Sequence, residues 1–182
     1  MRERTKGLLD PRTEHDACGV GFVVNVNGER SHDIIEKALA VLRNLTHRGA
    51  CGCDPLTGDG AGILVQVPDE FYRRECKSAR MPALPAPGRY GVGMVFLPRE
   101  VRQKNECERI FEKIIREEGQ SLVGWRRVPI DEGAPGPVAR AALPDVRQVF
   151  IGAGRNADDQ DALERKLYVI RKRVEARVRT SG

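Results

Sequence analysis

The chain has 182 residues, which is long enough for one folded domain with a hydrophobic core. Charged residues make up 31% of it, and the 40% hydrophobic content excludes a disordered chain. The net charge of +5 comes from 31 basic against 26 acidic residues. Most of the basic excess lies at the C-terminal end, without interleaved aromatic residues or a recognisable nucleic-acid module, so we expect no nucleic-acid binding. No apolar run approaches the roughly 20 residues of a membrane span, which predicts no membrane insertion.

The cysteines and the first residues indicate the compartment. The five cysteines, at positions 18, 51, 53, 76 and 107, are odd in number and fit no disulfide framework, which favours a reducing environment. Residues 1–17 carry charges and one proline without periodicity, and they lack the apolar stretch of a secretory signal. We therefore expect a cytoplasmic protein whose first 17 residues form an extended leader, mobile or removed.

A strand, a turn and a helix are predicted after this leader. Residues 18–26 are rich in glycine and β-branched side chains and predict a strand. The pair Asn27-Gly28 is a strong tight-turn signal that ends it. Ser31 can then cap a helix that runs to about Arg43 or Leu45, with its apolar residues at helical spacing.

The rest of the chain alternates strands and helices. The predicted elements are, in order, a strand at 63–67, a helix from Pro68 or Asp69 to about Cys76, a proline-rich loop at 77–89, a strand at 90–97, a helix from Pro98 to about Glu118 closed by Gly119, a strand at 121–130, a glycine- and proline-rich connection at 131–144, a strand at 146–153, and a helix from about Asp158 to Val178 with Leu163, Leu167, Ile170 and Val174 along one seam. This pattern fits an α+β fold as well as a parallel sheet, and the pattern alone does not choose between them.

Residues 45–62, LTHRGACGCDPLTGDGAG, form the stretch that is densest in glycine and polar residues, and such loops commonly hold functional sites. A metal site is not favoured, because the spacing of His47, Cys51 and Cys53 fits no zinc finger. A nucleotide site is not favoured either, because TGDGAG lacks the Lys-Ser/Thr of a P-loop. Its glycines permit close backbone approach to a small polar ligand, or simply a tight turn.

Cys18 and Arg48 are the candidate site residues. Ala17 precedes Cys18, and cleavage between them would create an N-terminal cysteine that carries a nucleophile and a base at once. Local sequence alone favours the alternative, a buried strand cysteine. Arg48 follows the first predicted helix, where a lone arginine is usually a surface charge. Beside a cysteine nucleophile, however, its guanidinium suits the α-carboxylate of an amino acid.

Three segments carry a family resemblance: DACGVGF at 16–22, LTHRGACGCDPLTGDGAGILVQVP at 45–68 and LERKLYVIRKRVE at 163–175. They resemble the amino-terminal glutaminase domain of the glutamate synthase large subunit, a class II glutamine amidotransferase. The resemblance implies an α+β N-terminal-nucleophile (Ntn) hydrolase fold, a four-layer αββα sandwich. It also implies removal of residues 1–17 as a propeptide, and residues 18–182 would be the N-terminal part of the domain.

The implied reaction is hydrolysis of the glutamine side-chain amide, which supplies ammonia for glutamate biosynthesis in nitrogen metabolism. Cys18 would be the catalytic nucleophile, Arg48 would hold the substrate α-carboxylate, and Asp59 and Gly60 would line the pocket. No cofactor is implied for this chain, although the family's synthase portion uses FMN and an iron–sulfur cluster. The implied partners are glutamine and the remainder of the synthase.

The oxyanion-hole Asn-Gly motif, the Ser-Arg-Phe-Ser-Thr motif and a later acidic residue of the family are not found before Gly182. An oxyanion donor is typically worth about 10² to 10³ in rate. The sequence therefore leaves an alternative open, a non-catalytic fragment or assembly module of a split glutamate synthase.

Overall fold

The computed structural model describes residues 19–46, 49, 54, 56–58 and 60–181. The described chain divides into two compact units. The first comprises residues up to Leu64 together with Gly133–Ala141, and the second comprises Val65–Glu132 and the chain from Ala142 onward.

The first unit contains two helices, α1 (His32–Asn44) and the short α4 (Pro137–Ala141). Ser31 occupies the N-cap position of α1, as predicted, although its side chain makes no capping hydrogen bond. The predicted turn at Asn27-Gly28 is confirmed: Gly28 N donates to Asn25 O at 3.0 Å, and Gly28 has a positive φ of 73°. Such a φ favours glycine, which explains the residue at this position.

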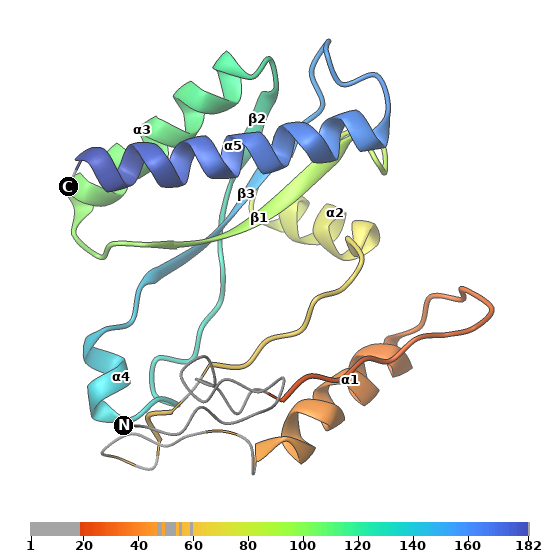
Figure 1. Ribbon diagram of the computed structural model, residues 1–182, viewed down its shortest axis with the longest axis vertical. Helices are drawn as coiled ribbons and strands as arrows, with labels where there is room; N and C mark the ends of the chain where they lie inside the picture. The colour runs from red at the N-terminus through yellow and green to blue at the C-terminus, as the bar shows by residue number, and fades with distance from the viewer. Residues whose placement is uncertain (1–18, 47–48, 50–53, 55, 59, 182) are drawn as a thin grey trace, which may run out of the picture. The chain divides into compact units, whose positions relative to one another are not determined.

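The second unit is a three-stranded antiparallel sheet with helices on both faces (Figure 1). Its elements are α2 (Asp69–Ser78), β1 (Tyr90–Leu97), α3 (Val101–Glu117), β2 (Ser121–Arg127), β3 (Asp145–Gly152) and α5 (Gln160–Ser181). The strand order is β1-β3-β2, and β3 pairs antiparallel with both neighbours. The helix-and-strand pattern therefore resolves to an α+β fold with an antiparallel sheet, the broad class that the family resemblance implied.

The side chains of β3 alternate between two hydrophobic cores. Val149 and Ile151 pack with α3 and α5, which lie side by side over this face (Figure 1). Phe150 packs on the opposite face in a cluster with Cys76 of α2 and Tyr90 of β1. Both faces of this central strand are buried at Val149–Ile151, where the sequence is apolar without interruption, and the strand prediction was accurate to one residue at each end.

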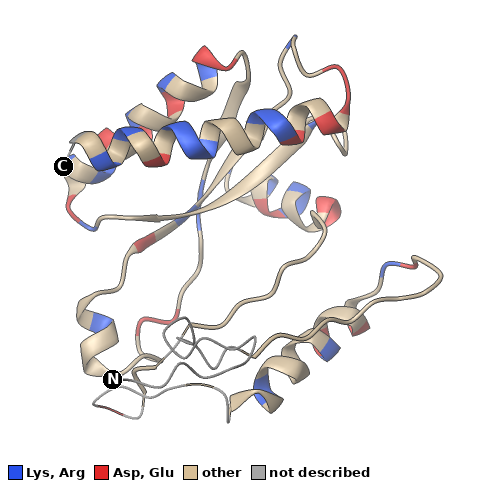
Figure 2. Cartoon of the chain, viewed as in Figure 1, with Lys and Arg blue, Asp and Glu red and all other residues tan. Residues whose placement is uncertain are grey.

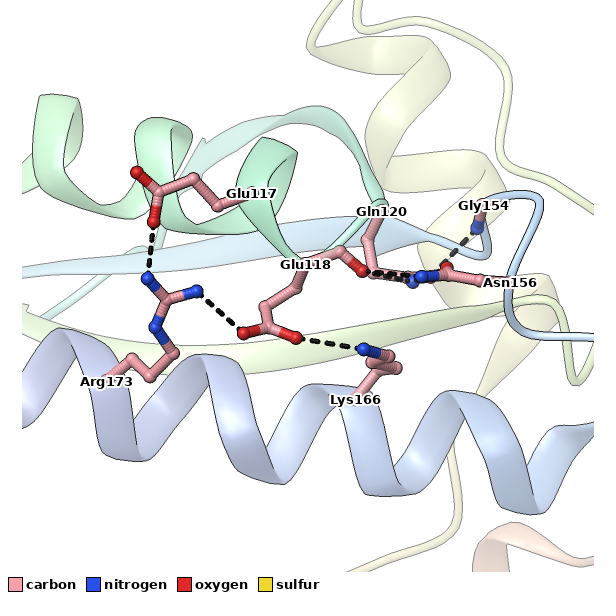
Figure 3. A network of polar contacts seen from close by, with 7 residues as sticks. All are labelled: Glu117, Glu118, Gln120, Gly154, Asn156, Lys166 and Arg173. Carbon is pink, nitrogen blue, oxygen red and sulfur yellow. Dashed lines mark hydrogen bonds and ion pairs between the residues drawn. The ribbon is translucent and has the colours of Figure 1, made fainter.

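A polar network around Gln120 fixes the end of α3 (Figure 3). Gly119 closes the helix with a positive φ of 71°, as predicted. Gln120 Nε2 donates to Glu118 O at 3.0 Å and to Asn156 Oδ1 at 2.7 Å, while its Oε1 accepts from Gly154 N at 2.8 Å. The turn after α3 is thereby joined to the loop that precedes α5.

The basic residues of α5 are interleaved with acidic residues (Figure 2). Lys166 and Arg173 form ion pairs with Glu118, the C-cap residue of α3, at 2.9 Å and 2.6 Å. Arg173 also pairs with Glu117. These basic side chains of the C-terminal end therefore hold α5 against α3.

Two predicted strands are wrong in the described residues. Residues 19–26 and 63–67 form no strand, and their apolar side chains are exposed, with Val20 at 89% and Leu64 at 101%. A strand requires hydrogen bonds to a neighbouring strand, and the described chain provides none for either segment. Alternating apolar residues predict an extended backbone but do not supply its partner.

Two boundaries and one connection also differ from the prediction. The helix expected from Pro98 begins at Val101, because the Glu100 carboxylate caps it by accepting from Arg102 N and Gln103 N at 2.9 and 2.7 Å. The strand expected at 121–130 ends at Arg127. The connection at 131–144 contains α4, whose first residue is Pro137, a favoured first helical residue.

Candidate functional site

Most of the predicted site residues lie outside the described residues. These are Ala17, Cys18, Arg48 and Asp59, and the cysteines and histidine weighed for a metal site, His47, Cys51 and Cys53, lie outside them as well. Gly60 is described and exposed. The described residues that flank these positions show the local geometry around the site.

The segment that follows Cys18 runs against α1 at two glycines. A Cβ on Gly21 would lie 2.5 Å from Val41 Cγ1, and a Cβ on Gly19 would lie 3.0 Å from Leu45 Cδ2. Both distances are too short for any larger residue without movement of the helix side chain. The Gly-x-Gly pattern after Cys18 therefore allows the backbone at residues 19–21 to approach α1 closely.

The end of α1 leads the chain into the His47-Arg48-Gly49 motif. Leu45 N donates to Val41 O and to Leu42 O, both at 3.1 Å, and Thr46 Oγ1 donates to Arg43 O at 2.6 Å. Gly49 N then donates to Thr46 O at 3.1 Å. These bonds satisfy carbonyl groups at the end of the helix and turn the chain.

The described flanks of the two motifs around Cys18 and Arg48 approach each other at Gly19 and Leu45. Gly19 directly follows Cys18, and Leu45 precedes Arg48 by three residues. Three residues span at most about 11 Å. The described flanks of the proposed nucleophile and of the proposed carboxylate ligand therefore come from one small region of the first unit.

Asp54 and Thr57 are residues that the sequence analysis missed. The Asp54 carboxylate accepts from Thr57 Oγ1 at 2.6 Å and from Leu56 N at 3.0 Å. The Thr57 hydroxyl, followed by backbone N–H groups, holds the pKa of Asp54 below its ordinary value. An Asp followed three residues later by Thr within a glycine-rich loop is a local turn signal that could have revealed them.

The described cysteines are poor nucleophiles. Cys76 is 2% exposed, and burial raises the pKa of its thiol. Burial also raises the pKa of Cys107, and Glu106 and Glu108 add to this effect. A raised pKa leaves less thiolate at neutral pH, so neither thiol suits nucleophilic attack.

In the part of the chain that the structure describes, no three His, Cys, Asp or Glu side chains gather in a way that could hold a metal ion. Among the described helices, none combines the length and the apolar character that crossing a membrane requires.

A family model and several individual proteins are similar to this chain in sequence. A sequence model of the family "Glutamine amidotransferases class-II" matches residues 18–182. The chain is 48% identical over 172 residues to the glutamate synthase [NADPH] large chain of Bacillus subtilis, covering 94% of this chain and 11% of that protein. It is 40% identical to the glutamate synthase [NADH] of Saccharomyces cerevisiae, covering 95% and 8%. It is 36% identical to the ferredoxin-dependent glutamate synthase 1 of Arabidopsis thaliana, covering 100% and 11%.

The chain thus spans about a tenth of the length of these relatives. The family match covers nearly all of the chain and includes Cys18 and the whole of the segments 45–68 and 163–175. On these findings, the chain belongs to the class II glutamine amidotransferases.

Proposed function

We propose that this chain is the N-terminal part of a glutaminase domain that hydrolyses the side-chain amide of glutamine and supplies ammonia for glutamate synthesis. The observation that carries the proposal is the close approach of Gly19 to Leu45, since a Cβ on Gly19 would lie 3.0 Å from Leu45 Cδ2, and these residues are described flanks of Cys18 and Arg48. The names of the relatives, all glutamate synthases, support the same substrate class. The family match starts at residue 18, the proposed nucleophile.

The proposed reaction uses an N-terminal cysteine. The α-amino group of Cys18, with a reference pKa of about 7.7–8.0, accepts the proton of the thiol, whose reference pKa is about 8.5. The sulfur attacks the amide carbon of glutamine, the carbon–nitrogen bond breaks, and the proton passes to the departing ammonia. Water then attacks the glutamyl thioester, which releases glutamate and restores the thiol. This scheme needs no separate histidine.

Three further residues complete the proposed site. Arg48 binds the α-carboxylate of glutamine through its guanidinium, and Asp59 and Gly60 line the pocket. Exposure of Gly60 and the open space around it support a place where a ligand can approach, since nothing lies within 4 Å of the position of a Cβ.

The proposal includes the processing and the complete fold. Residues 1–17 are removed between Ala17 and Cys18, and residues 18–182 contribute to a four-layer αββα sandwich of the Ntn-hydrolase type. Two features of the second unit support this layering. Helices α3 and α5 cover one face of an antiparallel sheet, and Met94 and Phe96 of β1 are exposed, at 51% and 68%. An exposed apolar sheet surface of this kind suits packing against a second sheet.

Cofactors, partners and location are also part of the proposal. The glutaminase step uses no cofactor, and FMN and the iron–sulfur cluster of the family belong to the synthase portion outside this chain. The synthase portion is the proposed partner, and the cytoplasm is the proposed location.

Labelling with a diazo-ketone analogue of glutamine tests the proposed nucleophile. We expect an intact mass that lacks residues 1–17 and a single adduct on Cys18, with protection by glutamine. Cys18→Ser should abolish the adduct, whereas Cys53→Ser should retain it. A chain with a free N-terminal Cys18 that is labelled on another cysteine, or not at all, would contradict the proposal.

Substitution of Arg48 tests the proposed carboxylate contact. Arg48→Lys loses the two parallel hydrogen bonds, so the analogue concentration for half-maximal labelling should rise about ten- to a hundredfold. Arg43→Lys is the matched control, because Arg43 is exposed in the last turn of α1. An equal effect of the two substitutions would remove Arg48 from the substrate site.

A further inference from the structure

The glycine-rich loop is anchored by a segment about 80 residues further along the chain. Gly136 N donates to Leu56 O at 2.9 Å, and Ala139 N donates to Thr57 Oγ1 at 3.3 Å. The segment Gly133–Ala141 belongs to the first unit, although the chain before and after it belongs to the second. The loop and α4 therefore form one structure despite their distance in the sequence.

Asp54 and Thr57 are the centre of this anchor. Thr57 accepts the N–H of Ala139 and donates its own hydroxyl proton to Asp54 Oδ2, at 2.6 Å. The other carboxylate oxygen, Oδ1, accepts from Leu56 N, and the carboxylate also accepts from the N–H of Val138. The hydroxyl can serve α4 and the loop together only because it is donor and acceptor at once.

Gly136 shows how closely the two parts fit. A Cβ at this position would lie 1.9 Å from Asp54 Oδ1. Any larger residue would therefore displace either the carboxylate or the backbone of the segment that precedes α4. The absence of a side chain at Gly136 is what admits the carboxylate to the start of the helix.

The anchor lies directly before the proposed pocket residues. Gly60 follows Thr57 by three residues, so its Cα lies within about 11 Å of the anchor. Gly60 is exposed and has no atom within 4 Å of the position of a Cβ. The hydrogen bonds of Asp54 and Thr57 hold the loop just before this open position.

We propose that Asp54 and Thr57 are positioning residues for glutamine, which hold the loop that leads to Gly60 through their hydrogen bonds to residues 136–139. This inference rests on the proposed function. The two residues do not contact the reacting atoms in this scheme. They act by keeping the substrate-binding loop in register with the nucleophile, since a misplacement of about 1 Å can cost about a hundredfold in rate.

The test compares Thr57→Val with Thr57→Ser in the full chain. Valine keeps the shape but loses both hydrogen bonds, so the analogue concentration for half-maximal labelling of Cys18 should rise about tenfold or more. Serine keeps the hydroxyl and should restore wild-type behaviour within about twofold. The rate of Cys18 alkylation by iodoacetamide, which needs no glutamine pocket, should stay unchanged in both variants.

Controls separate this inference from the proposed function. If the wild-type chain is not labelled at Cys18 by the analogue, the proposed function fails. If it is labelled and Thr57→Val has the same half-maximal concentration as wild type, only the positioning role fails. Thr180→Val, at the end of α5 in the other unit, should change neither quantity.

A second variant covers the case in which Thr57→Val does not fold. Asp54→Asn keeps the size of the side chain and one acceptor oxygen. The Thr57 hydroxyl would then face either the NH₂ group or the uncharged oxygen of the asparagine in place of the carboxylate. Circular dichroism establishes that the variant is folded. A folded Asp54→Asn chain with unchanged half-maximal concentration would overturn the positioning role, and a severalfold rise would support it.

Discussion

Replacing Glu118 by glutamine tests how the end of α3 is held against α5. Glu118 Oε1 accepts from Arg173 at 2.6 Å and Oε2 accepts from Lys166 at 2.9 Å (Figure 3). The hydrogen bond from Lys166, followed by that from Arg173, holds the pKa of Glu118 below its ordinary value. Glutamine keeps one acceptor oxygen, but it presents an NH₂ group to a cation in place of the other.

The expected loss of stability follows from the exposure of the three side chains. A hydrogen bond to a charged group contributes about 1.5–3 kcal/mol when well shielded, and an exposed ion pair contributes about 0–1 kcal/mol. The Glu118 side chain is 13% exposed, whereas Lys166 is 31% and Arg173 42% exposed. Screening at the two cations places the pair of bonds between these limits. We therefore expect the free energy of unfolding to fall by about 1–3 kcal/mol.

Urea unfolding followed by tryptophan fluorescence measures this change. The chain has one tryptophan, Trp125 in β2, whose ring packs edge-on against Phe111 of α3 at 5.3 Å between centroids. Its emission therefore reports the packing of α3 on the sheet. Glu164→Gln is the matched control, because Glu164 is exposed on α5 and the structure describes no hydrogen bond or ion pair for it. Equal unfolding midpoints for the two variants would refute the reasoning.

The pH dependence gives a second check. Because the pKa of Glu118 is lower in the folded than in the unfolded chain, its contribution is fully present above the unfolded pKa of about 4.3. The contribution is lost as the pH falls through the folded pKa. The difference between wild type and Glu118→Gln should therefore shrink below about pH 4. A difference that keeps its neutral-pH size in acid would show that the charge of Glu118 is not its cause.

Two further substitutions test contacts of the second unit. Gly154→Ala should destabilise the chain by more than about 2 kcal/mol, because the new Cβ would lie 1.7 Å from the backbone oxygen of Gly119. Thermal unfolding measures this loss. The control Gly62→Ala should change the melting temperature little, because no atom lies within 4 Å of the position of a Cβ on Gly62. Tyr90→Phe should lower the free energy of unfolding by about 1–2 kcal/mol, because the hydroxyl of the buried Tyr90 donates to Asp69 Oδ1 at 2.8 Å. An unfolding midpoint equal to that of wild type would show that this hydrogen bond makes no net contribution to stability.

The family and most of the helices were accessible from the sequence. The two motifs around Cys18 and Arg48 identified the class II glutamine amidotransferases, and the family match over residues 18–182 confirms this. The predicted starts and ends of α1, α2 and α5 agree with the structure within about two or three residues. The hydrogen bonds of a helix join residues four apart, so a local sequence pattern contains nearly all the information that such an element needs.

Elements that depend on distant partners were decided by the tertiary structure. Residues 19–26 have the alternation of a strand, yet they run as an exposed segment against α1, because the described chain offers them no neighbouring strand. The α4 helix was missed within a glycine- and proline-rich connection. The N–H groups of Val138 and Ala139 in α4 donate to Asp54 and Thr57, which lie about 80 residues earlier in the sequence.

The sequence by itself determined the chemistry that is available: a thiol behind a small residue, an arginine after a helix and a glycine-rich loop. Only the tertiary structure decided which described neighbours of these groups come close to one another. Gly19, which follows the thiol, approaches Leu45, which precedes the arginine, and the hydrogen bonds of Thr57 join the glycine-rich loop to residues 136–139. Such contacts span up to about 80 residues of chain and depend on the fit of particular atoms, which no local pattern of residue types records.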